Sequence, residues 1–344
     1  MPDLFLMKKV KNILSAVRRK INNTNNDIGS LLGLNKTFFE NARGARIILY
    51  HGICMNDPTR FNNIFLPLII FKEHIRFYKQ HFHVISLDDF YNERFRPDRF
   101  NVCICFDDGY ANNYRYVLPL LEQEKIPAAF FITAIRATGH DILWNDFLGI
   151  IGKYGPAELV FQNRVYQKKR FKRYVSVKEG VELKEMLRSG GFEIKQEMMK
   201  ALYSLVPFKQ NSQDEEYWQQ MTETEIRQLS ASPWVTVGSH GYYHNDLSRI
   251  KPLDAEKEML EGKKYLEKLT GREIRSIAFP YGAYTPAVVE SAKKIGFKQL
   301  LATDFLFEDD RSDKSMRERF TINPFVSVNG QMIANIKGHY EPRH

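Results

Sequence analysis

The sequence has few cysteines and no long apolar stretch. Three cysteines occur in 344 residues, and we interpret Cys54, Cys103 and Cys105 as small buried hydrophobic side chains rather than as a disulfide or a metal pair. This low count fits a reducing compartment. No window approaches the roughly 18 consecutive apolar residues that a membrane-spanning helix requires. Internal repeats and low-complexity tracts are also absent, so the composition is that of an ordinary globular protein.

The first 21 residues lack the pattern of a secretory signal peptide. Their basic residues are interleaved with apolar ones instead of preceding an apolar block, and no small-residue cleavage site follows. The helical spacing leaves one apolar and one cationic face, which suits a helix lying on an anionic membrane. A helix packed on the protein's own core explains the pattern equally well. We therefore treat residues 1–44 as a basic amphipathic extension and predict a cytoplasmic protein, peripheral to the inner membrane if the first interpretation holds.

The net charge of +9 indicates anionic partners of some kind. Much of the excess lies in three clusters, Lys8–Lys11, Arg18–Lys20 and Lys168–Arg173. Such clusters can meet nucleic acid, anionic lipid or an acidic glycan. No zinc-finger or RNA-recognition signature accompanies them, so we do not expect a nucleic-acid partner.

Strand and helix signals alternate along most of the chain. Short apolar runs at 46–50, 102–106, 128–132, 235–237, 276–279 and 299–302 predict buried strands, and segments of helical spacing separate them. Repeated strand–helix units of this kind indicate an α/β fold with a parallel sheet covered by helices. Residues 139–221 break the rhythm and are too long for a structureless loop. We expect one domain over 45–338 with a mostly helical insertion at about 139–221, and a tail at 339–344.

Two adjacent carboxylates follow one of these strands. Asp107 and Asp108 come directly after the apolar run that ends at Phe106. His240 and His244 follow another strand, and they share one face if the turn between them is helical. An Asp and two His leave open coordination positions, as in catalytic rather than structural metal sites. The pattern predicts hydrolysis by metal-activated water, with the second carboxylate free for proton transfer.

Two further strand ends carry candidate site residues. Pro280 and Gly282 force a sharp turn that exposes backbone N–H groups, which can stabilise an oxyanion. His51 ends the first core strand. It is either a hydrogen-bonded histidine on the barrel rim or a general acid.

Three motifs in this order resemble the polysaccharide deacetylases, the NodB-homology group of carbohydrate esterase family four. They are Phe106-Asp-Asp-Gly109, His240-Gly-Tyr-Tyr-His244 and Phe279-Pro-Tyr-Gly282. The resemblance covers residues 45–140 and 220–325. It implies a distorted (β/α)7-type barrel and removal of an acetyl group from a sugar.

The resemblance also implies roles for individual residues. Asp107 corresponds to the catalytic base, and Asp108, His240 and His244 correspond to the metal ligands. The backbone N–H of Tyr281 would help to bind the oxyanion. Zinc is the expected metal, although the same ligands accept cobalt, nickel or iron. The expected partner is an acetylated glycan, as a surface polysaccharide or its lipid-linked precursor, with N-acetyl favoured over O-acetyl.

Two of the departures from the family pattern affect the assignment of site residues. The arginine that usually precedes Pro280 and steadies the catalytic Asp is missing, and Arg275 or Arg319 could replace it. The usual late His motif is not evident around His339. The chain resembles instead the branch that begins with a Tyr-His strand, which implies His51 as the acid. Two alternatives stay open: a catalytically silent glycan-binding protein on this fold, and an amide hydrolase with a non-sugar substrate.

Overall fold

The computed structural model describes residues 35–60, 63–210 and 212–340. The expected amphipathic helix at 1–21 lies outside these residues, as does most of the predicted extension and the end of the tail. The membrane contact proposed for that helix therefore stays a prediction. Among the described helices, none is both long enough and apolar enough to cross a membrane.

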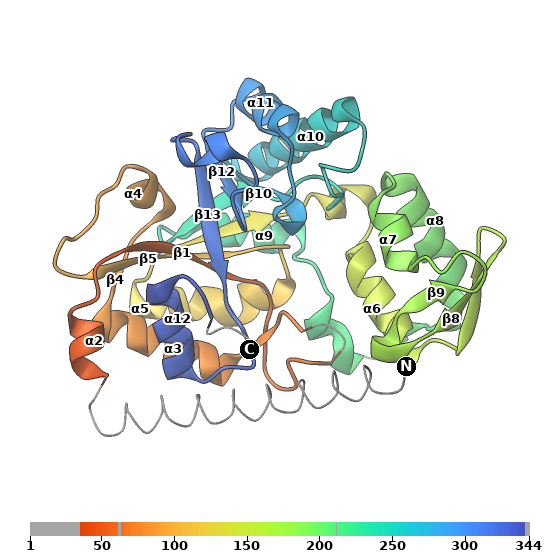
Figure 1. Ribbon diagram of the computed structural model, residues 1–344, viewed down its shortest axis with the longest axis horizontal. Helices are drawn as coiled ribbons and strands as arrows, with labels where there is room; N and C mark the ends of the chain where they lie inside the picture. Colours follow the sequence, from red (N-terminus) through yellow and green to blue (C-terminus); the bar gives the residue numbers. More distant parts are fainter. Residues whose placement is uncertain (1–34, 61–62, 211, 341–344) are drawn as a thin grey trace, which may run out of the picture.

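Seven parallel strands form a closed barrel at the centre of the molecule (Figure 1). In spatial order they are β1 (Gly44–Tyr50), β13 (Met316–Thr321), β12 (Gln299–Ala302), β11 (Ser276–Ala278), β10 (Val235–Ser239), β6 (Ala128–Ile132) and β5 (Phe100–Phe106). Pairing between β5 and β1 closes the circuit, and the short β4 (His83–Val84) pairs with the beginning of β5. The expected α/β barrel is thereby confirmed.

Strand alternation divides the barrel residues between two apolar clusters. On β1 and β5, Ile47, Leu49, Cys103 and Cys105 belong to the cluster inside the barrel. The residues that alternate with them belong to the larger cluster beneath the helices; they are Ile48, Val102, Ile104 and Phe106. Because successive side chains point to opposite faces, the residues that continue the inner series past the strand ends are also aimed inward.

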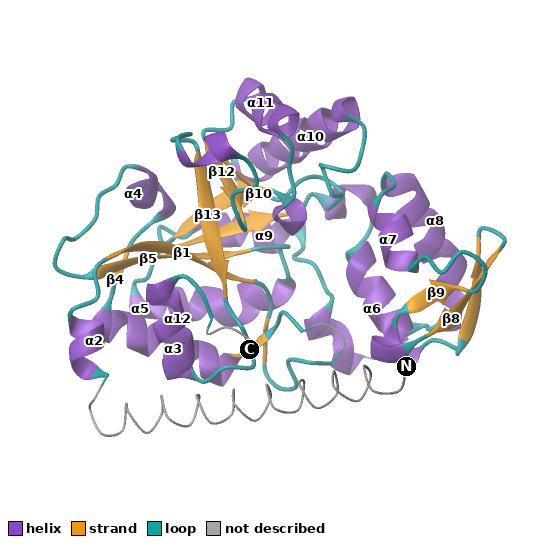
Figure 2. Cartoon of the chain, viewed as in Figure 1, coloured by secondary structure: helices purple, strands orange, loops and turns teal. Residues whose placement is uncertain are grey.

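Helices surround the barrel and cover the outer cluster (Figure 2). Those outside the insertion are α2 (Lys36–Glu40), α3 (Leu68–His81), α4 (Leu87–Tyr91), α5 (Leu118–Glu124), α9 (Glu223–Ala231), α10 (Pro252–Thr270), α11 (Pro286–Ile295) and α12 (Val328–Lys337), and a short pair of strands, β2 (Ile53–Cys54) and β3 (Leu66–Pro67), follows β1. Local signals set several boundaries. Thr222 and Glu225 form a capping box at the start of α9, and Gly271 ends α10 in the left-handed conformation.

The segment at 139–221 packs around an apolar cluster of its own, beside the barrel (Figure 1). It contains α6 (Trp144–Tyr154), α7 (Leu183–Arg188) and α8 (Phe192–Leu202) and an antiparallel sheet of β7 (Glu158–Phe161), β8 (Arg164–Lys168) and β9 (Tyr174–Ser176). We refer to this segment as the insertion.

The structure adds elements that the apolar pattern did not predict. The barrel strand β13 and the helix α12 after it were both missed. In β13 the buried inward position is occupied by Arg319, so the strand has no apolar alternation to detect.

Candidate metal centre

The two carboxylates lie where β5 leaves the barrel. Tyr50 of β1 pairs with Phe106 of β5, and the Tyr50 carbonyl accepts a hydrogen bond from Asp107 N–H at 3.1 Å. Asp107 continues the inward series of Cys103 and Cys105. Asp108 has a left-handed backbone with φ of 76°, a conformation that costs a non-glycine residue on the order of 1–3 kcal/mol. The turn separates the neighbouring carboxylates, and both are buried.

Asp107 is held by Arg319 of β13. The guanidinium donates two hydrogen bonds, from Nη1 to Oδ1 at 2.6 Å and from Nη2 to Oδ2 at 2.8 Å, and both side chains are fully buried. Burial alone would raise the pKa of Asp107, but Arg319 and His240 more than offset it and lower the pKa. Asp107 is therefore kept as a carboxylate.

The two histidines converge through a loop and not through a helix, so the helical turn considered for them is wrong. Gly241 and His244 take left-handed conformations, with φ of 78° and 59°, and no helix is assigned over these residues. His240 N–H donates to the carbonyl of Ile132 at 2.9 Å, which fixes the start of this loop at the end of β6. The loop, and not a helical repeat, brings the two rings to one point.

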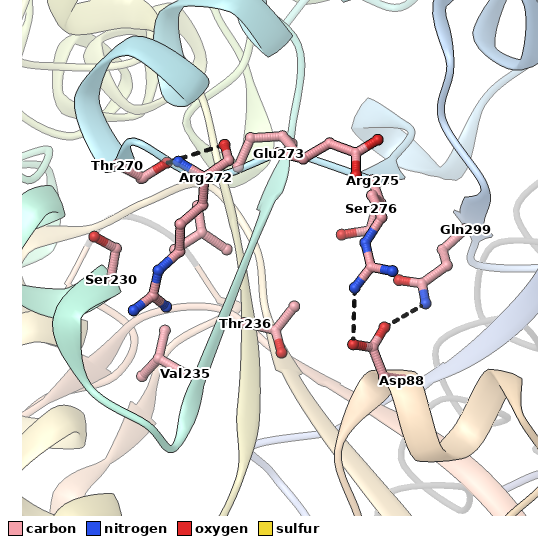
Figure 3. Close-up of a pocket in the computed structure, with 12 residues that line it drawn as sticks. Asp88, Ser230, Val235, Thr236, Thr270, Arg272, Glu273, Arg275, Ser276 and Gln299 are labelled. Atoms are coloured by element: carbon pink, nitrogen blue, oxygen red, sulfur yellow. Dashed lines mark hydrogen bonds and ion pairs between the residues drawn. The ribbon is translucent and has the colours of Figure 1, made fainter.

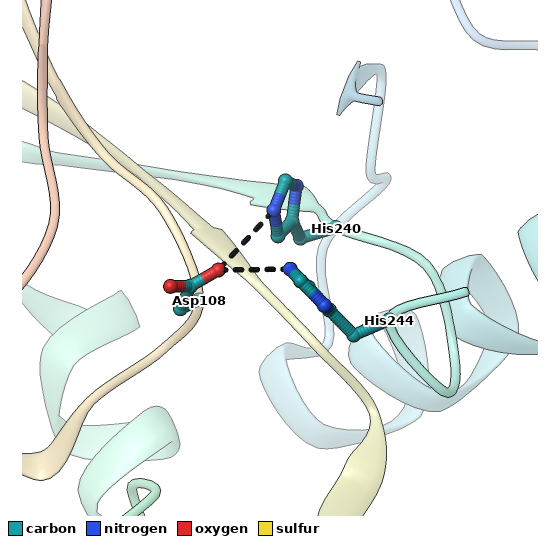
Figure 4. Close-up of side chains that lie close together, drawn as sticks. All are labelled: Asp108, His240 and His244. Atoms are coloured by element: carbon teal, nitrogen blue, oxygen red, sulfur yellow. Dashed lines mark ion pairs between the residues drawn. The ribbon is translucent and has the colours of Figure 1, made fainter. Parts of the chain in front are cut away.

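Asp108, His240 and His244 form a buried cluster whose ligand atoms all lie within 4.8 Å of one another. Asp108 Oδ1 lies 3.4 Å from His240 Nε2 and 3.1 Å from His244 Nε2 (Figure 4). His240 Nδ1 lies 2.8 Å from the carbonyl oxygen of Ala278, which can only accept, so Nδ1 carries the proton. The Nε2 lone pair then faces Asp108. One carboxylate and two imidazole nitrogens are a donor set that fits a divalent cation.

The charges in this cluster are coupled. Burial alone would raise the pKa of Asp108, but hydrogen bonds to His240 and His244 hold it well below its usual range. Burial alone would lower the pKa of His240, but Asp107 and Asp108 more than offset it and raise it. Burial lowers the pKa of His244. Asp108 is thus ionised, as a metal ligand must be, whereas the raised pKa of His240 favours its imidazolium without a metal. A metal bound through His240 Nε2 would displace that proton.

His51 lies near this cluster, and His339 is on the surface. His51 directly follows the inward series of Ile47 and Leu49, at the same level as Asp107. Burial lowers the pKa of His51, and this effect is opposed by the nearby carboxylates Asp108 and Asp107. His339 is exposed, and its Nδ1 lies 3.3 Å from the carbonyl oxygen of Tyr340.

The turn after β11 places Tyr281 against the cluster. Tyr281 is left-handed, with φ of 62°, and its ring packs edge-on against His244 at 4.8 Å between centroids. Gly282 also has positive φ, and any side chain there would collide with Thr303. Asp108, His244 and Tyr281 are thus three non-glycine residues in left-handed conformations at one site, a clustering typical of functional centres.

The sequence profile of the polysaccharide deacetylases matches residues 96–300, which include all three motifs. The chain belongs to the polysaccharide deacetylase family.

The chain is similar in sequence or in fold to several known proteins, at low sequence identity. Over 84 residues the chain is 24% identical to YxkH of Bacillus subtilis (strain 168), a curated protein named for this family, and the match spans 24% of this chain and 30% of that one. The Streptococcus pyogenes deacetylase PplD, solved in complex with acetate, has a TM-score of 0.53 at 16% identity, covering 88% of this chain and 100% of PplD. IcaB from Ammonifex degensii has a TM-score of 0.52 at 16% identity, covering 86% and 97%.

Of the two arginines considered as partners of Asp107, Arg319 contacts it and Arg275 does not. Arg275 pairs instead with Asp88 at 3.1 Å, on the surface. Together with Gln299 they line a cavity of about 390 Å³ at the first residues of β10, β11 and β12 (Figure 3). That cavity is at the opposite end of the barrel from the metal cluster, because the strands are parallel and the cluster follows their last residues. The candidate site is therefore the cluster at the carboxyl ends of the strands, where α/β barrels place their active sites.

The insertion contributes side chains to the candidate site, and no sequence pattern pointed to them. Trp144 Nε1 donates to the carbonyl of His244 at 3.2 Å. The Arg188 guanidinium lies 4.6 Å from the centroid of the Tyr281 ring and pairs with buried Asp246 at 2.7 Å. These contacts come from helices α6 and α7, so the insertion packs against the loop that carries His244 and against the turn at Tyr281.

A buried charge network contacts the loop that carries His240 and His244, which we call the His loop. Glu258 of α10 accepts hydrogen bonds from the backbone N–H groups of Tyr243 and Asn245, each at 3.1 Å, and from Asn245 Nδ2 at 2.7 Å. The ammonium of Lys195, from α8, donates to Asn245 Oδ1 and to the carbonyl of Gly190 at 3.1 Å. Burial lowers the pKa of this lysine to about 8. The network connects the insertion to the residue that follows His244.

Proposed function

We propose that this protein is a metal-dependent deacetylase that removes an acetyl group from a sugar, N-acetyl in preference to O-acetyl. The substrate is a surface polysaccharide or its lipid-linked precursor. The observation that carries the proposal is that the neighbouring carboxylates Asp107 and Asp108 have different partners. Asp108 belongs to the metal-binding cluster, whereas Asp107 is held ionised by Arg319 beside it. A site with a spare carboxylate next to its metal ligands is suited to hydrolysis.

Asp108, His240 and His244 would hold the metal, with zinc the first choice and cobalt, nickel or iron as alternatives. A divalent ion there would lower the pKa of a bound water and polarise the acyl carbonyl. The tautomer of His240 supports this fit. Because Nδ1 donates to the carbonyl of Ala278, Nε2 is the nitrogen that would bind the metal.

Three further groups have assigned roles. Asp107 accepts the proton of the attacking water, because Arg319 keeps it ionised and orients both of its oxygens. The backbone N–H of Tyr281 donates to the oxyanion that develops on the acyl oxygen. His51 donates a proton to the departing amine or alkoxide. Its place at the strand end beside Asp107 supports this role, as does the surface position of His339.

An acetyl substrate is supported by the family and by the acetate bound to a protein of similar fold. PplD, which shares the barrel, was solved with acetate. In this chain, Tyr281 Oη and His244 Nδ1 are buried and have no hydrogen-bond partner within the described residues. Leaving such atoms unsatisfied costs roughly 1–3 kcal/mol each, so polar substrate groups or water at this position would stabilise the site.

The test is acetate release, measured by mass spectrometry, from N-acetylglucosamine oligomers, O-acetylated glycans, lipid-linked acetylated precursors and a panel of cyclic amides. Asp107→Asn should keep the fold and the metal but lose most turnover, because only the proton acceptor changes. Asp309→Asn is the matched control, since this exposed residue also stands in an Asp-Asp pair.

Each outcome of this screen has a distinct meaning. Glycan deacetylation that requires Asp107 supports the proposal. Glycan binding without acetate release would indicate a silent binding protein. Turnover of cyclic amides alone would indicate an amide hydrolase with a non-sugar substrate. Near-normal turnover by Asp107→Asn would make Asp107 a structural turn residue.

A further inference from the structure

The β7–β9 sheet of the insertion has an apolar face that does not pack on the insertion core. Its inner face carries the buried side chains of Leu159, Phe161, Tyr166 and Tyr174. On the outer face Val160 of β7 pairs with Val165 of β8. Val177 lies next in the same row, because its N–H donates to the Val165 carbonyl at 2.9 Å.

The exposure of this valine row is unusual for the solvent face of an antiparallel sheet, which is ordinarily polar. The exposed fractions of Val160, Val165 and Val177 are 60%, 39% and 57%. Val181, which follows β9 and accepts a hydrogen bond from Ser176 N–H at 2.8 Å, is 44% exposed. Figure 1 shows β8 and β9 at the outer end of the molecule, with α6, α7 and α8 between them and the barrel. The row therefore faces away from the rest of the described chain.

The loop that joins β8 to β9 adds an exposed aromatic ring among basic residues. Its sequence is Lys168-Lys-Arg-Phe-Lys-Arg173, and Lys169 N–H closes the loop by donating to the Arg173 carbonyl at 2.7 Å. Phe171 is 71% exposed and has a left-handed backbone, with φ of 62°. The Arg170 guanidinium lies 4.7 Å from the centroid of this ring. A bulky apolar residue is thus held in an unfavourable backbone conformation with most of its side chain in water.

The charges of this loop are only partly neutralised within the insertion. Arg173 pairs with Glu182 at 3.2 Å, and the ammonium of Lys168 donates to the Gly155 carbonyl. Lys169 and Arg170 are exposed, and the contacts described for them are with the neutral amide of Gln167 and with the Phe171 ring. The loop keeps an excess of positive charge at its surface.

We propose that the valine row and this loop, together the insertion tip, dock on an anionic lipid bilayer. Cationic side chains are attracted to the anionic headgroups, while Phe171 and the valines enter the headgroup–acyl boundary, where apolar and aromatic side chains are stabilised. A polyanion in water, such as nucleic acid or an acidic glycan, would use the basic residues but would give the aliphatic valines no apolar environment. The combination therefore favours a membrane. This docking is separate from the proposed deacetylation, and it does not depend on residues 1–21.

The experiment is co-sedimentation of the full chain with phosphatidylcholine vesicles, with and without phosphatidylglycerol. We expect binding only with the anionic lipid. Lys169→Glu combined with Arg170→Glu should weaken it at least about 25-fold, since each basic residue near such a surface contributes roughly 1 kcal/mol, or about fivefold. Phe171→Asn should also weaken binding while leaving the fold intact, because asparagine tolerates the left-handed backbone.

Matched controls separate local docking from general effects of charge and hydrophobicity. Lys257→Glu with Lys264→Glu makes the same charge change on exposed positions of α10, and Leu253→Asn removes a side chain that is 80% exposed there. These variants should bind as the wild type does. Loss of binding only in the tip variants supports the proposal.

Two results would overturn it. Wild-type binding by both tip variants would show that another part of the chain, such as residues 1–21, makes the contact. The second result is binding that depends on Lys169 and Arg170 but not on Phe171, together with equally strong binding to heparin or single-stranded RNA. It would identify a polyanion site in place of a membrane site.

Discussion

Two Arg–Asp pairs at opposite ends of the barrel allow a quantitative test of the site. Arg319 and Asp107 are buried, with 1% and 4% of their side-chain surfaces exposed, whereas Arg275 and Asp88 are 48% and 43% exposed. Breaking a buried pair by removing one partner leaves an uncompensated charge and costs on the order of 3–5 kcal/mol. An exposed pair contributes about 0–1 kcal/mol. We therefore expect Arg319→Met to be several kcal/mol less stable than Arg275→Met.

The difference should depend on pH in a defined direction. In the wild type the folded pKa of Asp107 is lowered, so its contribution to stability is present above about pH 4, the unfolded pKa of an aspartate, and is lost as pH falls through the folded pKa. Without Arg319, burial would raise the folded pKa above the unfolded one. Stability of the variant then falls as pH rises through that value. The gap between wild type and Arg319→Met should accordingly widen from about pH 4 towards neutrality.

The assay is urea unfolding followed by circular dichroism, at matched metal content and several pH values. Arg319→Met combined with Asp107→Asn should recover much of the lost stability, because both buried charges are gone, while acetate release stays low. Equal, small losses in Arg319→Met and Arg275→Met, or no recovery in the double variant, would refute the assignment of a buried ion pair at Asp107.

Three further predictions concern the metal, the acid and the support of the His loop. Chelation should abolish turnover and added zinc or cobalt should restore part of it, and His240→Ala should lose metal by elemental analysis; full occupancy in that variant would disprove the ligand set. His51→Ala should lower turnover while it retains metal, whereas His339→Ala should be mild; the reverse result would make His339 the acid. Lys195→Met should weaken metal affinity about 10–100-fold, as loss of groups that orient ligands does, and should alter the visible spectrum of the cobalt-loaded protein. Lys200→Met, an exposed change on the same helix, should do neither. Unchanged affinity and spectrum in Lys195→Met would show that Lys195 contributes only to packing.

The sequence by itself determined the elements that local pattern specifies. Strands β6 and β12 occupy the residues predicted for them, and α11 begins at Pro286 as expected. Short apolar runs bounded by turn residues carry enough information for this, because strand and helix periodicities are properties of neighbouring residues. The order of the motifs, each at a strand end, also predicted which residues would meet, since the carboxyl ends of parallel strands lie at one end of a barrel.

Only the tertiary structure decided which distant groups complete the site. Arg319 lies 212 residues from Asp107, on a strand that the apolar pattern did not reveal because its buried inward residue is charged. The two meet only because β1 pairs with β13 on one side and with β5 on the other. Likewise, Lys195 and Trp144 belong to a segment without sequence signals of function. Such pairings depend on strand order and packing between remote segments. A buried polar residue is stabilised by a partner that its own neighbours in sequence do not reveal.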